Sequence, residues 1–237
     1  MARAKNKEAT IGSQNRTVTP NEAKSALTHC IKLQRPIMMW GAPGIGKSDI
    51  VKQIADQEKR EVIDIRLPLW EPTDIKGIPY YNSKENNMVW AAPAELPTDP
   101  KSTAIVFLDE LNSAAPAVQA AAYQLILNRR VGQYHLPDGV SIVAAGNRDS
   151  DKGVTYRMPA PLANRFVHVE LRVDFEDWME WATTNHIHAD VVGYCTFAKQ
   201  DLYDFDPKGS SRSFATPRSW SFVSQLLSDD LPESTLT

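Results

Sequence analysis

Short apolar runs alternate along the chain with segments whose apolar residues recur three or four positions apart. The runs are typical of buried strands, and they occupy residues 36–40, 62–67, 104–110, 140–146 and 167–171. The segments are typical of amphipathic helices, and they occupy residues 20–33, 47–58 and 117–128. Strands and helices therefore alternate over most of the chain, which indicates an α/β fold.

A different pattern lies between the second and third strands. Residues 78–90 hold two short apolar and aromatic runs on either side of a polar stretch from Asn82 to Asn87. This arrangement predicts a hairpin that projects from the core, and an ordinary surface loop is the alternative.

The predicted secondary structure changes from mixed strands and helices to helices alone near Val173. Downstream, residues 177–184 and 190–199 have helical patterns, and Thr216 with Pro217 is a typical helix start. We therefore expect an α/β domain over residues 17–173 and a helical subdomain over residues 174–237. Little sequence follows the last helix, so this subdomain is expected to be incomplete. Residues 1–16 are polar and unpatterned, which predicts a flexible arm.

The first candidate for chemistry is the segment from Gly41 to Ser48, which matches the pattern G-x-x-x-x-G-K-[ST] between a predicted strand and a predicted helix. Its glycines let backbone N–H groups surround a phosphate chain, and Lys47 adds a full positive charge. Ser48 is placed to bind Mg²⁺. A glycine-rich turn without a ligand is the alternative. The predicted nucleotide-binding residues are Gly41, Ala42, Pro43, Gly44, Ile45, Gly46, Lys47, Ser48 and Asp49.

Polar side chains also follow two later strands. Asp109 and Glu110 end the run at 104–110, and we expect Asp109 to hold Mg²⁺ and Glu110 to polarise the attacking water. Asn147 follows the run at 140–146, where it could orient that water or contact the γ-phosphate. The alternatives are a structural acidic pair and a turn-forming asparagine.

The helix at 117–128 ends in Asn128, Arg129 and Arg130. We interpret the two arginines as a solvated helix end that complements the helix dipole, with contacts to a neighbouring molecule as the alternative.

Composition narrows the class of protein. The net charge of −3 gives no general attraction to nucleic acid or to an anionic membrane. Cys30 and Cys195 have neither metal-ligand nor disulfide spacing, which suits a reducing compartment. The polar start and the lack of an apolar run long enough to span a bilayer predict a cytoplasmic protein without a membrane partner.

Together these motifs resemble those of AAA+ ATPases, and within them the MoxR group, in particular the members that are encoded beside von Willebrand A domain proteins. The resemblance extends from about Thr17 to Leu227. It rests on five motifs in the family's order, which are 41–48 (Walker A), 105–110 (Walker B), 136–139 leading into 144–148 (sensor 1), 161–166 (arginine finger) and 216–220 (sensor 2).

This resemblance implies a parallel five-stranded sheet, a C-terminal helical lid and a homo-oligomeric ring, usually a hexamer. The hairpin at 78–90 matches the helix-2 insert of the group. Arg165 is then expected to act on the nucleotide of a neighbouring subunit, the alternative being a salt-bridged surface residue. Arg218 is expected to contact nucleotide from the lid of its own chain. Arg148 and Arg157 are further candidates for the subunit interface.

The resemblance implies Mg²⁺-dependent ATP hydrolysis coupled to chaperone-like remodelling of a partner protein, such as one with a von Willebrand A domain, or to insertion of a metal or cofactor. An AAA+ motor that acts on nucleic acid is the alternative, which the acidic net charge and the lack of a nucleic-acid module disfavour. A monomeric P-loop kinase is a third interpretation, and it would leave Asn147, Arg165 and Arg218 without roles.

Overall fold

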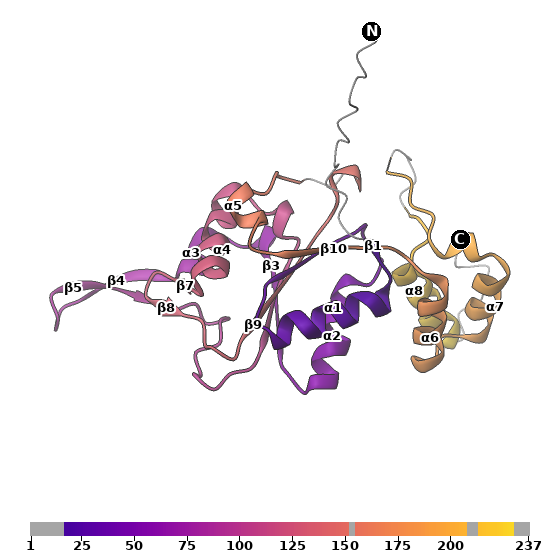
Figure 1. Ribbon diagram of the computed structural model, residues 1–237, viewed down its shortest axis with the longest axis horizontal. Coiled ribbons are helices and arrows are strands. Elements are labelled where there is room, and N and C mark those ends of the chain that lie inside the picture. The colour runs from indigo at the N-terminus through magenta and orange to yellow at the C-terminus, as the bar shows by residue number, and fades with distance from the viewer. Residues whose placement is uncertain (1–16, 152–154, 208–212, 230–237) are drawn as a thin grey trace, which may run out of the picture.

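The computed structural model describes residues 17–151, 155–207 and 213–229, and the predicted arm at 1–16 lies outside them. Six parallel strands form the central sheet in the order β1-β10-β2-β9-β6-β3 (Figure 1). They are β1 (Thr17–Val18), β2 (Ile37–Trp40), β3 (Val62–Arg66), β6 (Ile105–Asp109), β9 (Ser141–Gly146) and β10 (Val167–Leu171). The five predicted strands are all present. The sixth, β1, pairs with β10 and is too short to give a periodic pattern.

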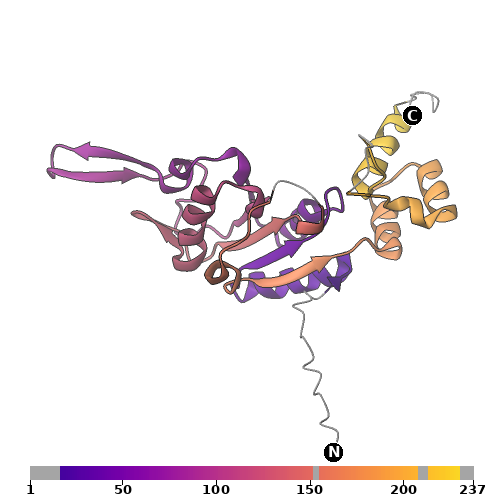
Figure 2. The ribbon, with the colours of Figure 1, turned by 90° about the horizontal axis from the view of Figure 1, so that it is seen from above.

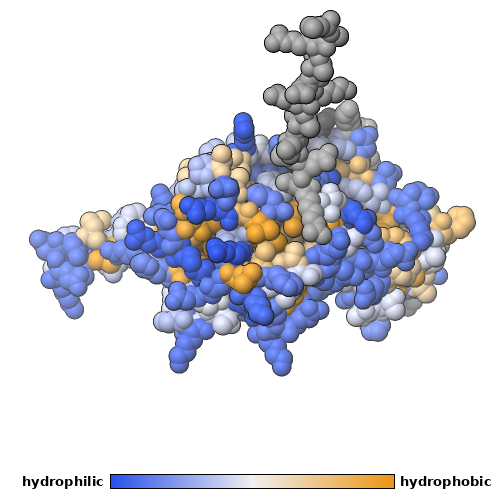
Figure 3. Space-filling model, viewed as in Figure 1, coloured by the Kyte–Doolittle hydropathy of each residue, from blue (hydrophilic) through white to orange (hydrophobic). Residues whose placement is uncertain are grey.

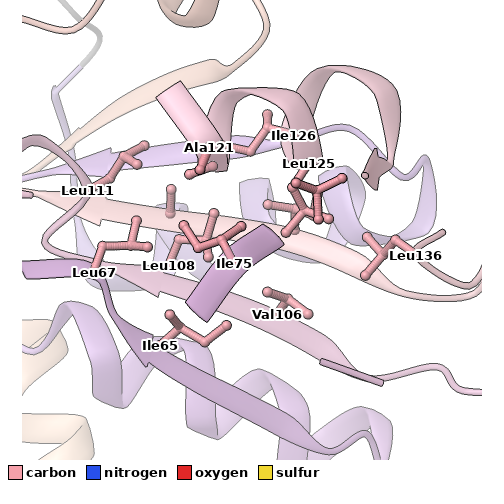
Figure 4. Close-up of a cluster of buried hydrophobic side chains, with 14 of the residues drawn as sticks. Ile65, Leu67, Ile75, Val106, Leu108, Leu111, Ala121, Leu125, Ile126 and Leu136 are labelled. Atoms are coloured by element: carbon pink, nitrogen blue, oxygen red, sulfur yellow. The ribbon is translucent and has the colours of Figure 1, made fainter. Parts of the chain in front are cut away.

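Helices cover both faces of the sheet, which gives three layers (Figures 1 and 2). On one face α1 (Pro20–Lys32) and α2 (Lys47–Glu58) share a buried cluster with Ile37 and Met39 of β2. On the other face, α3 (Pro72–Lys76), α4 (Pro116–Asn128) and α5 (Ala160–Ala163) belong to a layer whose cluster includes Met38. Figure 4 shows part of this cluster, with Ile75 of α3 and Leu125 of α4 among its labelled residues. Consecutive residues of β2 thus face opposite clusters, which explains why the strands are apolar without alternation.

Helix starts follow the local signals in the sequence. Thr19 and Glu22 form a capping box, in which the Glu22 N–H donates to Thr19 Oγ1 at 3.3 Å and the Thr19 N–H donates to Glu22 Oε2 at 3.0 Å. Single 3₁₀ turns follow three of the strands and one later helix, at Leu67–Leu69, Leu111–Ser113, Asp149–Asp151 and Lys199–Leu202.

The predicted hairpin is confirmed. β4 (Ile78–Asn82) and β5 (Asn87–Ala91) form an antiparallel pair that extends away from the core at one end of the molecule (Figure 2). Several of its large hydrophobic side chains are exposed, with Tyr80 at 51% and Tyr81 at 59%, whereas Trp90 near its base is partly buried. The hairpin therefore holds its shape by strand pairing rather than by packing on the core.

One expectation about the end of α4 is wrong. Arg129 is not a solvated helix end, because its guanidinium donates hydrogen bonds to the carbonyl oxygens of Pro137 at 2.7 Å and Val140 at 2.8 Å. Burial lowers the pKa of Arg129. The arginine joins α4 to the loop before β9, across a short ribbon of β7 (Arg130–Val131) and β8 (Tyr134–His135).

After β10 the named elements of the described chain are helical. They are α6 (Phe175–Thr184), α7 (Ala189–Phe197) and α8 (Pro217–Ser228), and they surround a small core of their own. Asn21 of α1 ties this subdomain to the sheet domain, donating from its backbone N–H to Asp177 Oδ2 at 2.7 Å and from its side chain to Glu180 Oε2 at 3.0 Å. The domain boundary near Val173 stays a prediction. No helix in the described part of the chain is both long and apolar enough to cross a membrane.

We predict that Arg129→Ala lowers the free energy of unfolding by about 1–3 kcal/mol, because it removes the donors of two loop carbonyls. Arg130→Ala is the matched control, since Arg130 is exposed, and it should change that free energy by less than about 0.5 kcal/mol. Urea unfolding followed by tryptophan fluorescence measures both. Equal losses in the two variants would contradict the structural role of Arg129.

Candidate active site

All the predicted site residues except Arg165 meet at one edge of the sheet, because parallel strands and the segments that follow them lead there. β2, β9 and β6 are neighbours, and they end at Trp40, Gly146 and Asp109. The segment after each strand therefore begins at the same edge, which is where α/β sheets bind ligands. The phosphate loop, the two acids and Asn147 are brought together, as the sequence predicts.

Lys47 lies at the centre of this edge. Its Nζ donates to the carbonyl oxygens of Gly41 at 2.6 Å and Ala42 at 2.9 Å, and to Asn147 Oδ1 at 3.2 Å. The loop therefore curls around its own lysine and joins β2 to β9 through it. Ile45 is 7% exposed, so the loop is also anchored by an apolar side chain.

The surroundings of Lys47 weaken its hold on a proton. Burial lowers the pKa of Lys47 to about 8, against the opposing effects of Asp109, Asp151 and Glu110, while Arg218 lowers it further. An anion bound at the loop would stabilise the charge of Lys47 in place of the water molecules that burial excludes. A bound phosphate chain would favour the protonated form of Lys47 at this helix N-terminus.

Ser48 and Asp109 face each other across the loop. Ser48 Oγ donates to Asp109 Oδ2 at 3.3 Å, and Asp109 is only 8% exposed. Glu110 follows in the left-handed backbone region, with φ 55°, and its N–H donates to Asp109 Oδ1 at 2.9 Å. The chain therefore turns at Glu110, directly after β6.

Sequence reasoning missed Asn112, which holds Asn147 in place. Asn112 Nδ2 donates to the Asn147 carbonyl at 2.8 Å, and the Asn147 N–H donates to Asn112 Oδ1 at 3.2 Å. Asn112 is 2% exposed. The available signal was a single amide among the apolar residues that follow Glu110.

Asp151 was also missed, and it changes the interpretation of Arg148. Arg148 Nη2 donates to Asp151 Oδ1 at 2.9 Å, and Arg148 Nη1 donates to Glu170 Oε1 at 3.1 Å. The hydrogen bond with Asp151 raises the pKa of Arg148 above its usual value. Arg148 is therefore engaged within its own chain, whereas Arg157 is exposed, and a role for either at a subunit interface stays a prediction.

The helical subdomain reaches the phosphate loop through the start of α8. The Arg218 N–H donates to the Gly44 carbonyl at 3.2 Å. A Cβ on Gly44, which has φ 77°, would lie 2.8 Å from Thr216 Oγ1. Arg218 itself is exposed, and it lines two clefts together with Asp49. The lid arginine therefore lies over the loop of its own chain.

One of these clefts is largely apolar and lies between α2 and the helical subdomain. Its lining includes Ile45 and Ile50 on one side and Trp178 and Trp181 on the other. Trp178 is 5% exposed, and its Nε1 has no hydrogen-bond partner among the described residues. The cleft thus has flat apolar walls, and this indole N–H is buried away from solvent.

Arg165 is the one predicted site residue that the fold keeps apart from the rest. It precedes β10, whose first residue Val167 pairs with Ile37, whereas Leu171 at the other end of β10 lies against Gly41. A five-residue strand spans about 16 Å, so Arg165 lies at the opposite edge of the sheet from its own phosphate loop. Arg165 is exposed, and its side chain has no hydrogen bond or ion pair within the described part of the chain.

A parallel sheet with a G-x-x-x-x-G-K-[ST] loop at its carboxyl edge, and acids on a neighbouring strand, defines a nucleotide-binding P-loop protein. Comparison with known proteins gives the family. The model for the ATPase family associated with various cellular activities (AAA) matches residues 36–168, which is more than half of the chain. The chain belongs to this family, and membership implies ATP hydrolysis.

Individual relatives agree with this assignment. Midasin of Giardia intestinalis is 29% identical over 185 residues, which are 74% of this chain and 4% of that protein. The structure of the RuvB Holliday junction branch migration motor of Thermotoga maritima aligns with a TM-score of 0.52 at 18% identity, covering 89% of this chain and 61% of that one. A mutant of the same RuvB gives a TM-score of 0.57 at 18% identity, covering 90% and 63%. At that identity the likeness shows the fold alone. This chain spans only a small part of midasin and less than two thirds of RuvB.

We predict that nucleotide affinity falls as pH rises through the pKa of Lys47. A phosphate chain binds the protonated lysine, whose pKa in the free protein is about 8, so ADP should bind about tenfold more weakly at about pH 9 than at about pH 7. Lys47→Arg keeps its charge over this range and should remove this slope. Isothermal titration with ADP measures both, and an unchanged slope in Lys47→Arg would contradict the assignment to Lys47.

Proposed function

We propose that the chain is the ATPase part of a ring of the MoxR type, in which Mg²⁺-dependent ATP hydrolysis drives remodelling of a partner protein. The main observation that supports a ring is the separation of Arg165 from the phosphate loop of its own chain. The other observations that support the proposal are the donor set for the metal, the geometry around Asn147 and the character of the hairpin.

The residues at the loop fit a magnesium ion. Ser48 Oγ and Asp109 Oδ2 lie 3.3 Å apart, and Mg²⁺ prefers oxygen ligands, usually a few from the protein with the rest from phosphate and water. Ser48 and Asp109 would therefore hold Mg²⁺. When bound, the ion would neutralise negative charge on the phosphates.

Glu110 and Asn147 are the groups that would handle water. Glu110 would polarise it as a base, and Asn147 would orient it or contact the γ-phosphate. The contact between Asn147 Oδ1 and Lys47 Nζ at 3.2 Å supports this, because it places the amide beside a group that would contact phosphate. Arg218 would add a positive charge from the lid.

The base of the nucleotide would occupy the apolar cleft between α2 and the helical subdomain. Trp178 and Trp181 supply flat apolar surface on which a purine ring could stack. The cleft adjoins Gly46 and Asp49 at the start of α2, so a single ligand would extend from it to the phosphate loop.

Arg165 would act in trans. An exposed arginine without a partner at the far edge of the sheet has no route to its own nucleotide, whereas a head-to-tail ring would bring it to the phosphate loop of the next subunit. A cation at that place is worth about 10³- to 10⁵-fold in rate in enzymes that use it.

Protein, rather than nucleic acid, is the partner class that the hairpin favours. Between residues 78 and 91 the only charged residues are Lys84 and Glu85, which leaves the hairpin without net charge. Its exposed surface carries Ile78, Tyr80, Tyr81 and Met88, and Figure 3 shows such hydrophobic residues among hydrophilic ones on the projection. Nucleic-acid surfaces are instead rich in lysine and arginine. A protein with a von Willebrand A domain is the proposed partner.

Mixed rings test the composite site. Arg165→Ala should bind ATP normally and turn over about 10³-fold more slowly, and Glu110→Gln should bind ATP without hydrolysing it. In an equal mixture of the two variants, about one quarter of interfaces pair an intact Glu110 with an intact Arg165 of the next subunit, so activity should return in proportion. Arg35→Ala, an exposed arginine at the same edge of the sheet, is the control and should stay active. Mixed rings that assemble and stay inactive at every ratio would count against action in trans.

Partner class is tested separately with Glu110→Gln rings held in ATP. These rings should retain a von Willebrand A domain protein, and a variant with Tyr80→Ser and Tyr81→Ser should release it while keeping its basal ATPase rate. Single-stranded and duplex DNA should leave turnover unchanged. Stimulation of turnover by DNA, without retention of the protein partner, would favour the nucleic-acid motor.

A further inference from the structure

Asn112 occupies a position that links two parts of the active site. It lies in the 3₁₀ turn Leu111–Ser113, two residues after Glu110, and its side chain reaches across to the end of β9. Its amide makes a two-point contact with the backbone of Asn147, as donor at 2.8 Å and as acceptor at 3.2 Å. One side chain thus satisfies both backbone groups of the residue expected to orient water.

Asn112 is itself fixed in place. Its own carbonyl accepts a hydrogen bond from the Tyr156 N–H at 2.7 Å, and its side chain is almost fully buried. Gly146 makes room for it, because a Cβ at Gly146 would lie 2.4 Å from Asn112 Oδ1. A buried amide with all these contacts has little freedom to rotate, so it acts as a rigid spacer.

The turn that carries Asn112 also sets the position of Glu110. Glu110 has a φ of 55°, a left-handed conformation that costs free energy and persists only where the surrounding structure enforces it. The Ser113 N–H donates to the Glu110 carbonyl at 2.8 Å, which closes the turn. The same turn therefore fixes the backbone of Glu110 at its start, and its middle residue, Asn112, is hydrogen-bonded to the backbone of Asn147.

We propose that Asn112 is a positioning residue that fixes the separation between Glu110 and Asn147, so that both can act on one water molecule. This inference rests on the proposed roles of Glu110 and Asn147. Asn112 would not contact nucleotide, and it would influence turnover only through its hydrogen bonds to the backbone of Asn147. Its loss should therefore lower kcat and leave nucleotide binding nearly unchanged.

Asn112→Leu tests the inference, because leucine has a similar size and neither donates nor accepts. We expect kcat to fall by about 10- to 100-fold, with KM for ATP and the affinity for ADP changed by less than about threefold. Asn112→Asp keeps the acceptor for the Asn147 N–H and loses the donor for its carbonyl. It should lower kcat as well, and it provides a variant of nearly identical shape if the leucine variant does not fold.

Gln119→Leu is the matched control. Gln119 is also 2% exposed, and its Nε2 donates to the Ala114 carbonyl at 3.0 Å without contacting Asn147. Its loss should lower the thermal unfolding temperature without selectively lowering kcat. A fall in kcat as large as that of Asn112→Leu would show that any damage to this buried layer slows turnover, which would overturn the inference.

A double-mutant cycle separates this inference from the proposed function. Asn147→Ala should lower kcat by about 10²-fold, and adding Asn112→Leu to it should change kcat by less than about threefold further. Additive losses, or a slow Asn147→Ala beside a fully active Asn112→Leu, would overturn the positioning role alone. A fully active Asn147→Ala would overturn the proposed role of Asn147 and this inference together.

Discussion

The active site depends on three neighbouring parallel strands that end at the same edge of one sheet. The ends of β2, β9 and β6 are connected through two side-chain contacts, from Lys47 to Asn147 at 3.2 Å and from Ser48 to Asp109 at 3.3 Å. A slip of one residue between these strands would turn each side chain to the opposite face of the sheet and separate both pairs. The buried apolar clusters on the two faces stabilise the strand register, and the register in turn keeps these two side-chain pairs in contact.

The same sheet separates the two arginines that the sequence marks as partners of nucleotide. Arg218 reaches the phosphate loop from above, because the start of α8 is hydrogen-bonded to Gly44. Arg165 comes before the first residue of β10 and so lies a full strand length away. In the proposed head-to-tail ring, Arg165 would serve the phosphate loop of the next subunit while Arg218 would serve that of its own chain.

Local patterns predicted most of the fold because they reflect local physics. The apolar runs at β2, β6 and β9 are buried on both faces, and the capping signals at Thr19 and Thr216 begin helices in the structure. The strands that were missed, β1 and the ribbon of β7 and β8, have two residues each. Two residues carry no periodicity, so only the pairing seen in the fold defines these strands.

By itself the sequence determined the phosphate loop, the acids and the order of strands and helices, because each of these is written in residues that are close together in the chain. Tertiary structure alone decided which polar residues support them. Asn112 and Asn147 are 35 positions apart, and Arg148 meets Glu170 over 22 positions, so both pairs depend on which strand ends lie side by side. The role of Arg129 likewise depends on tertiary structure, because its guanidinium donates hydrogen bonds to the loop before β9. Hydrogen bonds of this kind have no local signature, since a buried polar group needs a partner of suitable geometry and not a partner at a given spacing.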